Sequence, residues 1–280
     1  MKSSLLSEVV HVMNPRALPK LAALTCDIEP DFGGRTGTLE LLEDPTPAAG
    51  LLQWCKTQDI PLTGFVVTEL LAKNLPGIRS FREQGTELHP HAHTHDTRRY
   101  RTRSAEEIGR AQETWAKVFG TPALGYRAPQ GVVLPGDPEA LAAHGYQFDA
   151  SVFPTQRFGV FDYRSLPLTP WLWESGIWEI PFAATTKRSR LTLSTLKLYG
   201  QHFWEGKIAT LPPIVVIDMH LHDIVLPAST RKLPLLPRLA YARNRANGYV
   251  LLAWLTEELK RQGYQFTTME RIAAMLREMP

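Results

Sequence analysis

The sequence predicts a single α/β domain, residues 1–280, folded as a deformed (β/α)7-type barrel. Its length of 280 residues suits one large domain. Hydrophobic residues make up 44% of the chain, enough to bury a core, and the 21% of charged residues is not that of a disordered chain. Short apolar runs alternate with helical patterns about seven times, which indicates parallel βαβ units that close on one another.

The expected strands are short apolar runs, and the expected helices lie between them, bounded by caps and turn residues. The strands cover residues 21–28, 60–67, 86–91, 123–129, 146–153, 177–182, 212–220 and 264–268. The helices cover residues 44–59, 77–85, 104–120, 137–145 and 245–263, with a last helix after residue 268. Residues 154–204 are rich in Pro, Trp and Tyr and fit this pattern worst, so we expect an excursion over one mouth of the barrel.

Composition excludes several functional classes. A net charge of +3 gives no strong case for nucleic acid as a partner. Cys26 and Cys55 make neither a disulfide framework nor a thiolate metal cluster. The opening run "MKSSLLSEVVHVMN" lacks the apolar core of a secretory signal, and no uncharged span approaches the length of a membrane helix, about 20 residues. These features predict a cytoplasmic protein without an integral membrane segment.

The stretch "GTELHPHAHTHDT" places histidines at alternate positions, 89, 91, 93 and 95. In a strand, all four would lie on one face. If the chain turns after His91, His91 and His95 form a pair four residues apart instead. Two imidazoles and one carboxylate leave zinc an open position, the arrangement of catalytic sites.

Polar residues gather where the predicted strands end, and parallel barrels keep their chemistry at the carboxyl ends of the strands. These residues are Asp27, Glu29, Asp31, the histidine run, Arg127, Asp149, His220, His222 and Asp223. Each alone has a structural explanation, such as a helix cap. Together they match the needs of a metal hydrolase, in which one carboxylate accepts a proton from water and a histidine protonates the leaving amine.

The same segments resemble the polysaccharide deacetylase family, the NodB-homology domains of carbohydrate esterase family four. The resemblance runs from about Leu21 to Asp223 and follows the family's motif order through "LTCDIEPD", "ELHPHAHTH", "YRAPQG", "GYQFDASVFP" and "IDMHLHD". It implies a divalent metal, with Zn²⁺ expected, on His91, His95 and a carboxylate of the first motif.

The resemblance also implies the other roles. Asp27 would be the general base, with Arg127 paired to it, and His220 the general acid. Asp149 would belong to the same polar network, and a backbone N–H near Gln130 would stabilise the oxyanion. His222 would then be a loop or supporting residue.

Two departures from the family's pattern leave alternatives open. Ile28 follows Asp27 where a second Asp is common, so we expect Glu29 as the metal carboxylate, because strand alternation aims it to the side of Asp27. Asp31 is the alternative, if Pro30 turns the chain back. The tryptophan that follows the fourth motif is missing, and a wall for the acetyl methyl could come from Trp171, Trp173 or Trp178. Of the remaining histidines, His89 is expected inside the barrel and His93 at the surface.

The expected function is metal-dependent deacetylation, the hydrolysis of the N-acetyl amide of an amino sugar in a glycan or glycan precursor. A cytoplasmic precursor is favoured, which allows contact with a lipid-linked substrate. One alternative is an amidase of the same fold that acts on a non-sugar C–N bond in a cyclic imide or ureide, and a deformylase is another. A binding module that has lost catalysis is the third, and the presence of Asp27, His91, His95 and His220 speaks against it.

Overall fold

Parallel strands form the centre of the molecule. The structure, a computed structural model, describes residues 5–242 and 248–279. Strand β2 (Leu21–Ile28) lies between β11 (Ile214–His220) and β3 (Leu62–Val66), and β4 (Glu87–Pro90) follows β3, all in parallel. Nearly every residue of β2, β3 and β11 is buried, as expected for parallel strands covered on both faces.

A second arc of short strands completes the ring. It consists of β5 (Gly125–Tyr126), β6 (Phe148–Asp149) and β10 (Trp178–Glu179), paired in parallel. Single backbone hydrogen bonds connect the two arcs, from Arg127 N to Pro90 O (3.1 Å) and from Ala183 N to Val216 O (2.9 Å). Because the two arcs are connected by so few backbone hydrogen bonds, their seven parallel strands, all in the described part of the chain, form a deformed (β/α)7 barrel. The predicted fold class is confirmed.

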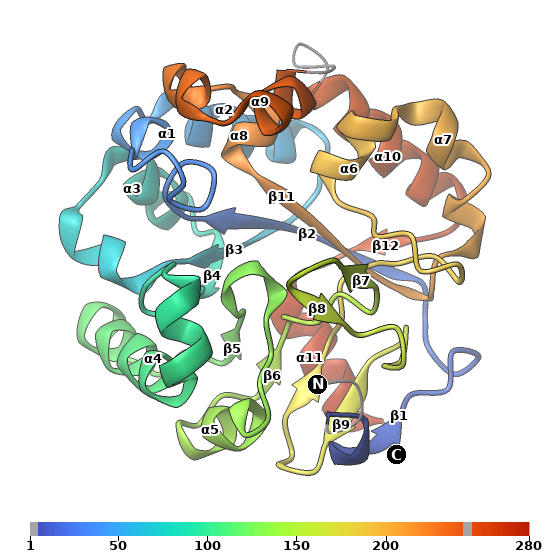
Figure 1. Cartoon of the computed structure of the whole chain (residues 1–280). Helices are drawn as coiled ribbons and strands as arrows, with labels where there is room; N and C mark the ends of the chain where they lie inside the picture. The colour runs from blue at the N-terminus through green and yellow to red at the C-terminus, as the bar shows by residue number, and fades with distance from the viewer. Residues whose placement is uncertain (1–4, 243–247, 280) are drawn as a thin grey trace.

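Helices lie around this ring (Figure 1). They are α1 (Glu40–Glu43), α2 (Thr46–Thr57), α3 (Pro76–Glu83), α4 (Thr97–Phe119), α5 (Asp137–Ala143), α6 (Leu193–Tyr199), α7 (Gln201–Glu205), α8 (Leu221–Ile224), α9 (Leu235–Ala242), α10 (Gly248–Arg261) and α11 (Met269–Glu278). Short 3-10 helices cover Leu5–Glu8, Thr68–Lys73, Pro129–Gly131, Ile208–Thr210 and Ala228–Lys232. The last strand, β12 (Gln265–Phe266), pairs with β2.

One predicted helix starts elsewhere than expected, and the predicted start of another cannot be compared with the described residues. The helix expected at 104–120 begins at Thr97, because the side chain of Asp96 caps it, and its backbone is kinked at Arg103. The helix expected at 245–263 is described from Gly248 onward, and its predicted first turn, residues 245–247, lies outside the described residues.

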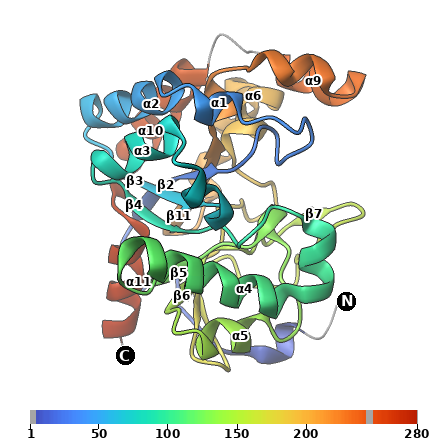
Figure 2. The ribbon, with the colours of Figure 1, turned by 90° about the vertical axis from the view of Figure 1, so that its left-hand side faces the viewer.

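Residues 154–204 contain several elements of different kinds. Strand β9 (Trp171–Trp173) pairs with β1 (Val9–Val12) and β10, so this part of the segment extends the sheet. The hairpin of β7 (Gln156–Arg157) and β8 (Phe161–Asp162) does project outward, on the same side of the molecule as α9 (Figure 2).

One hydrophobic cluster runs through both arcs of the ring, with large members such as Phe65, Phe148, Trp171 and Trp173 fully buried. Such a continuous core is what a single domain of this size requires. Among the described residues, no helix is both long and apolar enough to cross a membrane.

Candidate metal and catalytic site

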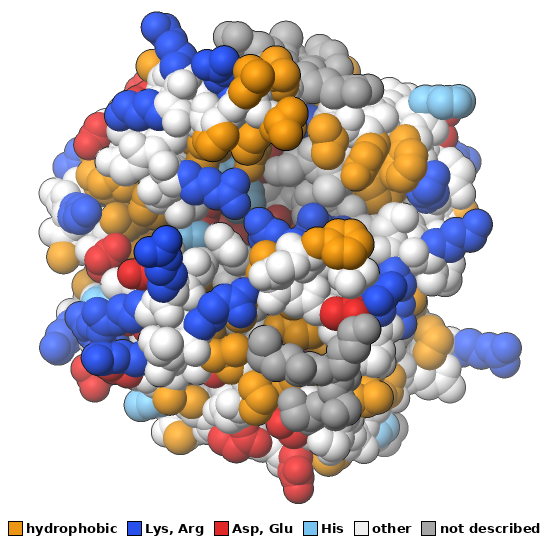
Figure 3. Space-filling model, in the orientation of Figure 1, with side chains coloured by type: hydrophobic (Ala, Val, Ile, Leu, Met, Phe, Trp, Pro, Cys, Tyr) orange, Lys and Arg blue, Asp and Glu red, His pale blue; other side chains and the backbone are white. Residues whose placement is uncertain are grey.

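A cavity of about 210 Å³ opens at the carboxyl ends of the barrel strands. Figure 3 shows this hollow, with histidine and acidic side chains inside it. The cavity is lined by every residue for which the sequence predicted a catalytic or metal-binding role except Asp149, namely Asp27, Glu29, His91, His95, Arg127 and His220.

The histidine run turns instead of continuing as a strand. Strand β4 ends at Pro90, and Ala92 adopts a φ of 59°, which breaks the alternation of side chains. As a result His91 and His95 approach each other, with ring centroids 5.2 Å apart. The Oε2 atom of Glu29 lies 2.7 Å from Nε2 of His95 and 3.5 Å from Nε2 of His91.

Hydrogen bonds define which nitrogen of each ring faces the carboxylate. Nδ1 of His91 lies 3.1 Å from the carbonyl oxygen of Arg127, and Nδ1 of His95 lies 3.2 Å from that of Gly33. A carbonyl oxygen can only accept a hydrogen bond, so both Nδ1 atoms carry a hydrogen. The Nε2 atom of each ring then has a free electron pair with which it can bind a metal.

The resulting donor set fits a divalent metal ion. Nε2 of His91 is buried without a hydrogen-bond partner in the described part of the chain. The ligand atoms of Glu29, His91 and His95 lie within 4.8 Å of one another. Two imidazole nitrogens and one carboxylate oxygen are typical of a catalytic zinc site, with one coordination position left for water or substrate.

The loop that carries these histidines is held on two sides. Oε2 of Glu107, on α4, accepts hydrogen bonds from both the N–H and the hydroxyl of Thr94, each at 2.8 Å. On the other side, Gly33 adopts a φ of 68°, and a Cβ atom there would lie 3.1 Å from Cε1 of His95. A glycine is therefore required both by the backbone conformation and by the closeness of the imidazole.

Asp31 has different contacts from Glu29. Its Oδ2 atom accepts hydrogen bonds from the hydroxyl of Thr38 (2.7 Å) and the N–H of Glu40 (2.8 Å), and its Oδ1 atom accepts one from the N–H of Leu41 (3.3 Å). Asp31 thus organises the loop after β2, and it does not line the cavity.

Asp27 forms a buried ion pair with Arg127, with Nη1 and Oδ1 2.6 Å apart. The guanidinium group also donates to Thr25 Oγ1 (2.9 Å) and to the carbonyl of Ala150 (3.0 Å), and it lies 3.7 Å from the centre of the Phe65 ring. Burial raises the pKa of Asp27, but Arg127 and the nearby histidines outweigh burial and lower it below the usual value. Asp27 is therefore ionised at neutral pH and able to accept a proton.

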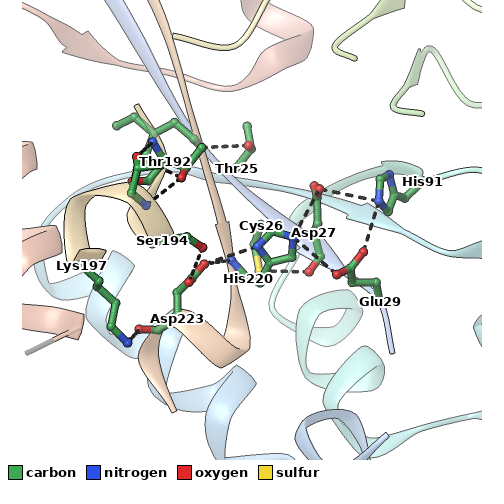
Figure 4. Close-up of polar contacts among 12 residues, drawn as sticks. Thr25, Cys26, Asp27, Glu29, His91, Thr192, Ser194, Lys197, His220 and Asp223 are labelled. Atoms are coloured by element: carbon green, nitrogen blue, oxygen red, sulfur yellow. Dashed lines mark hydrogen bonds and ion pairs between the residues drawn. The ribbon is translucent and has the colours of Figure 1, made fainter. Parts of the chain in front are cut away.

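His220 lies opposite these carboxylates (Figure 4). The register of β11 and β2 places it directly beside Asp27. Its Nε2 atom is 3.9 Å from Asp27 Oδ2 and 3.5 Å from Glu29 Oε1, and its Nδ1 atom is 3.4 Å from Asp223 Oδ2. Burial opposes the charged form of His220, but Asp218, Glu29 and Asp223 raise its pKa well above the usual value.

Asp223 is held in turn by the residues around it. It accepts hydrogen bonds from the N–H of His220 (2.9 Å) and from the hydroxyl of Ser194 (2.6 Å). A carboxylate fixed in this way orients the imidazole that it contacts.

His222 is close to His220 but lies deeper. Its ring stacks on that of His220, with centroids 4.6 Å apart, and packs against Phe32 at the same distance. Burial, followed by the charge of His220, lowers the pKa of His222 to about 4. The two histidines of "HLHD" therefore have opposite electrostatic environments.

Asp149 does not line the cavity, and its membership of the polar network around Asp27 stays a prediction. The register of β6 places it between Tyr126 and Glu179 in the barrel wall. Its carboxylate accepts a hydrogen bond from the hydroxyl of Ser151, which itself accepts one from the N–H of Ala128 (2.8 Å). Burial raises the pKa of Asp149 to about 7.

The tryptophans suggested as a wall for the acetyl methyl are also elsewhere. Trp171, Trp173 and Trp178 are buried in β9 and β10, and none of them lines the cavity. Phe153 and Phe182 form an apolar wall instead, with stacked rings whose centroids lie 3.7 Å apart.

The two remaining histidines of the run have separate environments. His89 packs inside the barrel, as predicted, between Phe65 and Phe148. His93 is only half-buried and lies outside the cavity, with Nδ1 3.1 Å from Thr68 Oγ1.

Sequence reasoning missed two sets of cavity residues. Asp218 could have been found, because it lies two positions before His220 on β11 and so faces the same side. Arg35, Arg157 and Arg190 also line the cavity but come from three distant segments, so no spacing in the sequence connects them.

Comparison with known proteins gives a family and a fold. The family model that matches residues 16–148 is described as polysaccharide deacetylase. A search of curated proteins finds no match to the sequence. A presumed polysaccharide deacetylase from Mycobacterium smegmatis is 18% identical, with a TM-score of 0.62 over 96% of this chain and 95% of that one.

Two further solved structures share the fold. The allantoinase PuuE is 16% identical, with a TM-score of 0.56 over 98% of this chain and 96% of its own. A pseudoenzyme of carbohydrate esterase family four from Bacillus anthracis is 12% identical, with a TM-score of 0.54 over 94% and 68%. At such identities the likeness shows the barrel, and the chemistry has to be argued from the site.

Proposed function

Because residues 16–148 match the family model described as polysaccharide deacetylase, we propose that this chain hydrolyses the N-acetyl amide of an amino sugar in a glycan or glycan precursor, with the aid of a divalent metal. One observation carries the proposal. The Nε2 atoms of His91 and His95 converge with Glu29 on one side of Asp27, and His220 lies on the other side.

The metal would be held by Glu29, His91 and His95, with Zn²⁺ favoured by the two imidazoles. When bound, such an ion polarises the amide carbonyl and makes water a better nucleophile at neutral pH. The chain supplies the geometry, because the hydrogen bonds from both Nδ1 atoms to backbone carbonyls orient the rings before any ligand arrives.

Asp27 would act as the general base. Its Oδ1 atom is engaged by Arg127, whereas its Oδ2 atom faces His91 at 3.7 Å and His220 at 3.9 Å, toward the space between them. Oδ2 is thus the oxygen that accepts the proton of the attacking water. Arg127 holds the carboxylate in place and keeps it ionised before the reaction.

His220 would be the general acid. It approaches the substrate from the side opposite to His91, and Asp223 orients its ring through Nδ1. The proton on Nε2 is then available to the departing amine. A backbone N–H near Gln130, which lines the same cavity, would donate to the carbonyl oxygen as negative charge develops there.

The test is metal analysis together with acetate release from a panel of N-acetylated sugars. We expect about one divalent ion per chain, and we expect the protein to release acetate from at least one of the sugars. The Asp27→Asn protein is the inactive control. Formate release from N-formylated sugars would favour the deformylase. Turnover of allantoin without any acetate release would favour the alternative function, an amidase that acts on a ureide. Full metal occupancy without any turnover would support a binding module.

A further inference from the structure

The mouth of the cavity is cationic. Arg35, Arg157 and Arg190 all line it, and Figure 3 shows Lys and Arg side chains around the hollow. The floor has the opposite character, because it holds the carboxylates of Asp27 and Glu29. The arginines of the rim and the predicted metal and catalytic residues of the floor therefore form two subsites of one cavity.

The three arginines come from separate segments, each of which is fixed in place. Arg35 lies in the loop that Asp31 organises through Thr38. Arg157 belongs to β7 and is paired with Phe161 in the projecting hairpin. Arg190 is bridged through its backbone to Ala184, and its guanidinium group lies 5.2 Å from the centre of the Phe153 ring. The fold therefore sets the backbone positions from which the three arginines reach the cavity.

Among the residues that the structure describes, these side chains have no salt-bridge partner. In the described ranges, none of the three guanidinium groups forms a salt bridge or a hydrogen bond, unlike Arg99, which binds both Glu106 and Glu107. Burial lowers the pKa of Arg190, and the negative charge of Asp218 opposes that shift. Burial, then the charges of Arg190 and Arg35, lowers the pKa of Arg157. Uncompensated like charges around one opening attract an anion from solution.

The chemistry of three guanidinium groups favours a phosphate over a carboxylate. A guanidinium group donates two parallel hydrogen bonds, and three such groups match the several oxygens of a phosphate or pyrophosphate better than a single carboxylate. We propose that the substrate is an N-acylated sugar that carries a phosphate or pyrophosphate, which binds Arg35, Arg157 and Arg190 while the acyl amide reaches the floor. The proposal names the substrate class of the same cavity and therefore rests on the proposed function.

The experiment compares N-acetylglucosamine 1-phosphate with N-acetylglucosamine by isothermal titration calorimetry. It uses the full chain, first dialysed free of metal and then with zinc restored, so that phosphate binding to the ion is separated from binding to arginine. We expect the phosphorylated sugar to bind at least about tenfold more tightly in both states, since hydrogen bonds between charged groups are the strong ones. The preference should weaken as the salt concentration rises.

Arginine variants test whether the rim causes the preference for the phosphorylated sugar over the neutral one. Arg157→Gln and Arg190→Gln should each reduce it by about tenfold. Arg35→Gln should reduce it too, and because Arg35 is exposed, this substitution leaves the folded core untouched. Arg16→Gln, at an exposed arginine that does not line the cavity, is the matched control and should leave the preference unchanged. Equal binding of the two sugars, or a preference that persists in all three rim variants, would overturn the proposal.

The binding assay does not depend on turnover. Tighter binding of the phosphorylated sugar without acetate release would support the rim subsite and contradict the proposed deacetylation. Acetate release from neutral sugars alone would support the deacetylation and contradict the rim subsite. Two further ligands distinguish the source of the phosphate. Tighter binding of UDP-N-acetylglucosamine indicates a nucleotide-linked substrate, and tighter binding of farnesyl-pyrophosphoryl N-acetylglucosamine in micelles indicates a lipid-linked one. Either result supports the subsite.

Discussion

The Nε2 atom of His95 lies 2.7 Å from the Oε2 atom of Glu29, although the two residues follow different strands of the sheet. Strands β2, β3 and β4 are parallel neighbours, so their carboxyl ends meet at the same edge. The loop after β4 then turns at Ala92 and brings His95 over the end of β2. This contact is the basis of the first two predictions.

We predict that His91→Ala removes the metal and the activity together, because His91 supplies a ligand nitrogen that has no hydrogen-bond partner among the described residues. The matched control is His93→Ala, two positions away, whose ring contacts Thr68 and lies outside the cavity. Metal content by mass spectrometry should be about one ion per chain in the control and near zero in the first variant. Full occupancy in His91→Ala would remove His91 from the ligand set.

The two carboxylates of "DIEPD" should respond differently. Glu29→Gln should lose the metal, because the amide is a poor ligand for zinc. Asp31→Asn should retain the metal but lower the free energy of unfolding by about 1–3 kcal/mol, since its oxygens accept hydrogen bonds that fix the loop. Metal analysis and denaturant unfolding would show the difference. The opposite pattern would make Asp31 the ligand.

Asp27→Asn should keep the metal and lower kcat by about 10²–10⁴-fold, which is the rate enhancement that a general base typically provides. The asparagine can still accept a hydrogen bond from Arg127, so the local structure should persist. Steady-state kinetics with metal content measured in parallel would check this. Near wild-type turnover would assign proton transfer to another carboxylate, such as Asp218.

His220→Ala should lower kcat by about two orders of magnitude or more at unchanged metal content. His222→Ala should lower kcat far less, because its buried ring packs between His220 and Phe32 and does not carry the proton. Its main effect should be on the melting temperature, through the cavity left in a packed region. A larger kinetic loss in His222→Ala than in His220→Ala would exchange their roles.

Asp149 should make stability depend on pH. Its pKa is about 7 in the folded chain, whereas an unfolded aspartate has a pKa of about 3.9. Between these values the folded state binds the extra proton, so this contribution to stability is complete below about pH 4 and is lost as the pH rises through about 7. We expect the melting temperature of Asp149→Asn to fall less between pH 5 and pH 8 than that of the wild type. Asp59→Asn, at an exposed position, should behave like the wild type, and identical slopes in all three proteins would contradict the prediction.

Much of the barrel and its site could be predicted because the information is local in the sequence. A strand that is buried on both faces must be apolar throughout, so "LAALTCDI" was identified over the full length of β2. Polar residues directly after such strands have to meet at one edge of a parallel sheet. The sequence pattern therefore predicts that Asp27, Arg127 and His220 lie together.

Other features depended on contacts between distant segments. Alternation would have placed all four histidines of the run on one face, and only the turn at Ala92, supported by the hydrogen bonds of Glu107 to Thr94, selects His91 and His95. Asp149 satisfied its motif, yet its place in the barrel wall aims the side chain at Ser151.

What the sequence by itself determined was the class of fold, the edge of the sheet that carries the chemistry and most of the residues gathered there. The tertiary structure decided which neighbour each of these side chains faces, and it assembled the rim of Arg35, Arg157 and Arg190 from three loops. The physical reason is the range of the interactions. Periodicity and strand burial are set by residues a few positions apart, whereas the direction of a loop side chain depends on the distant segments that pack against it.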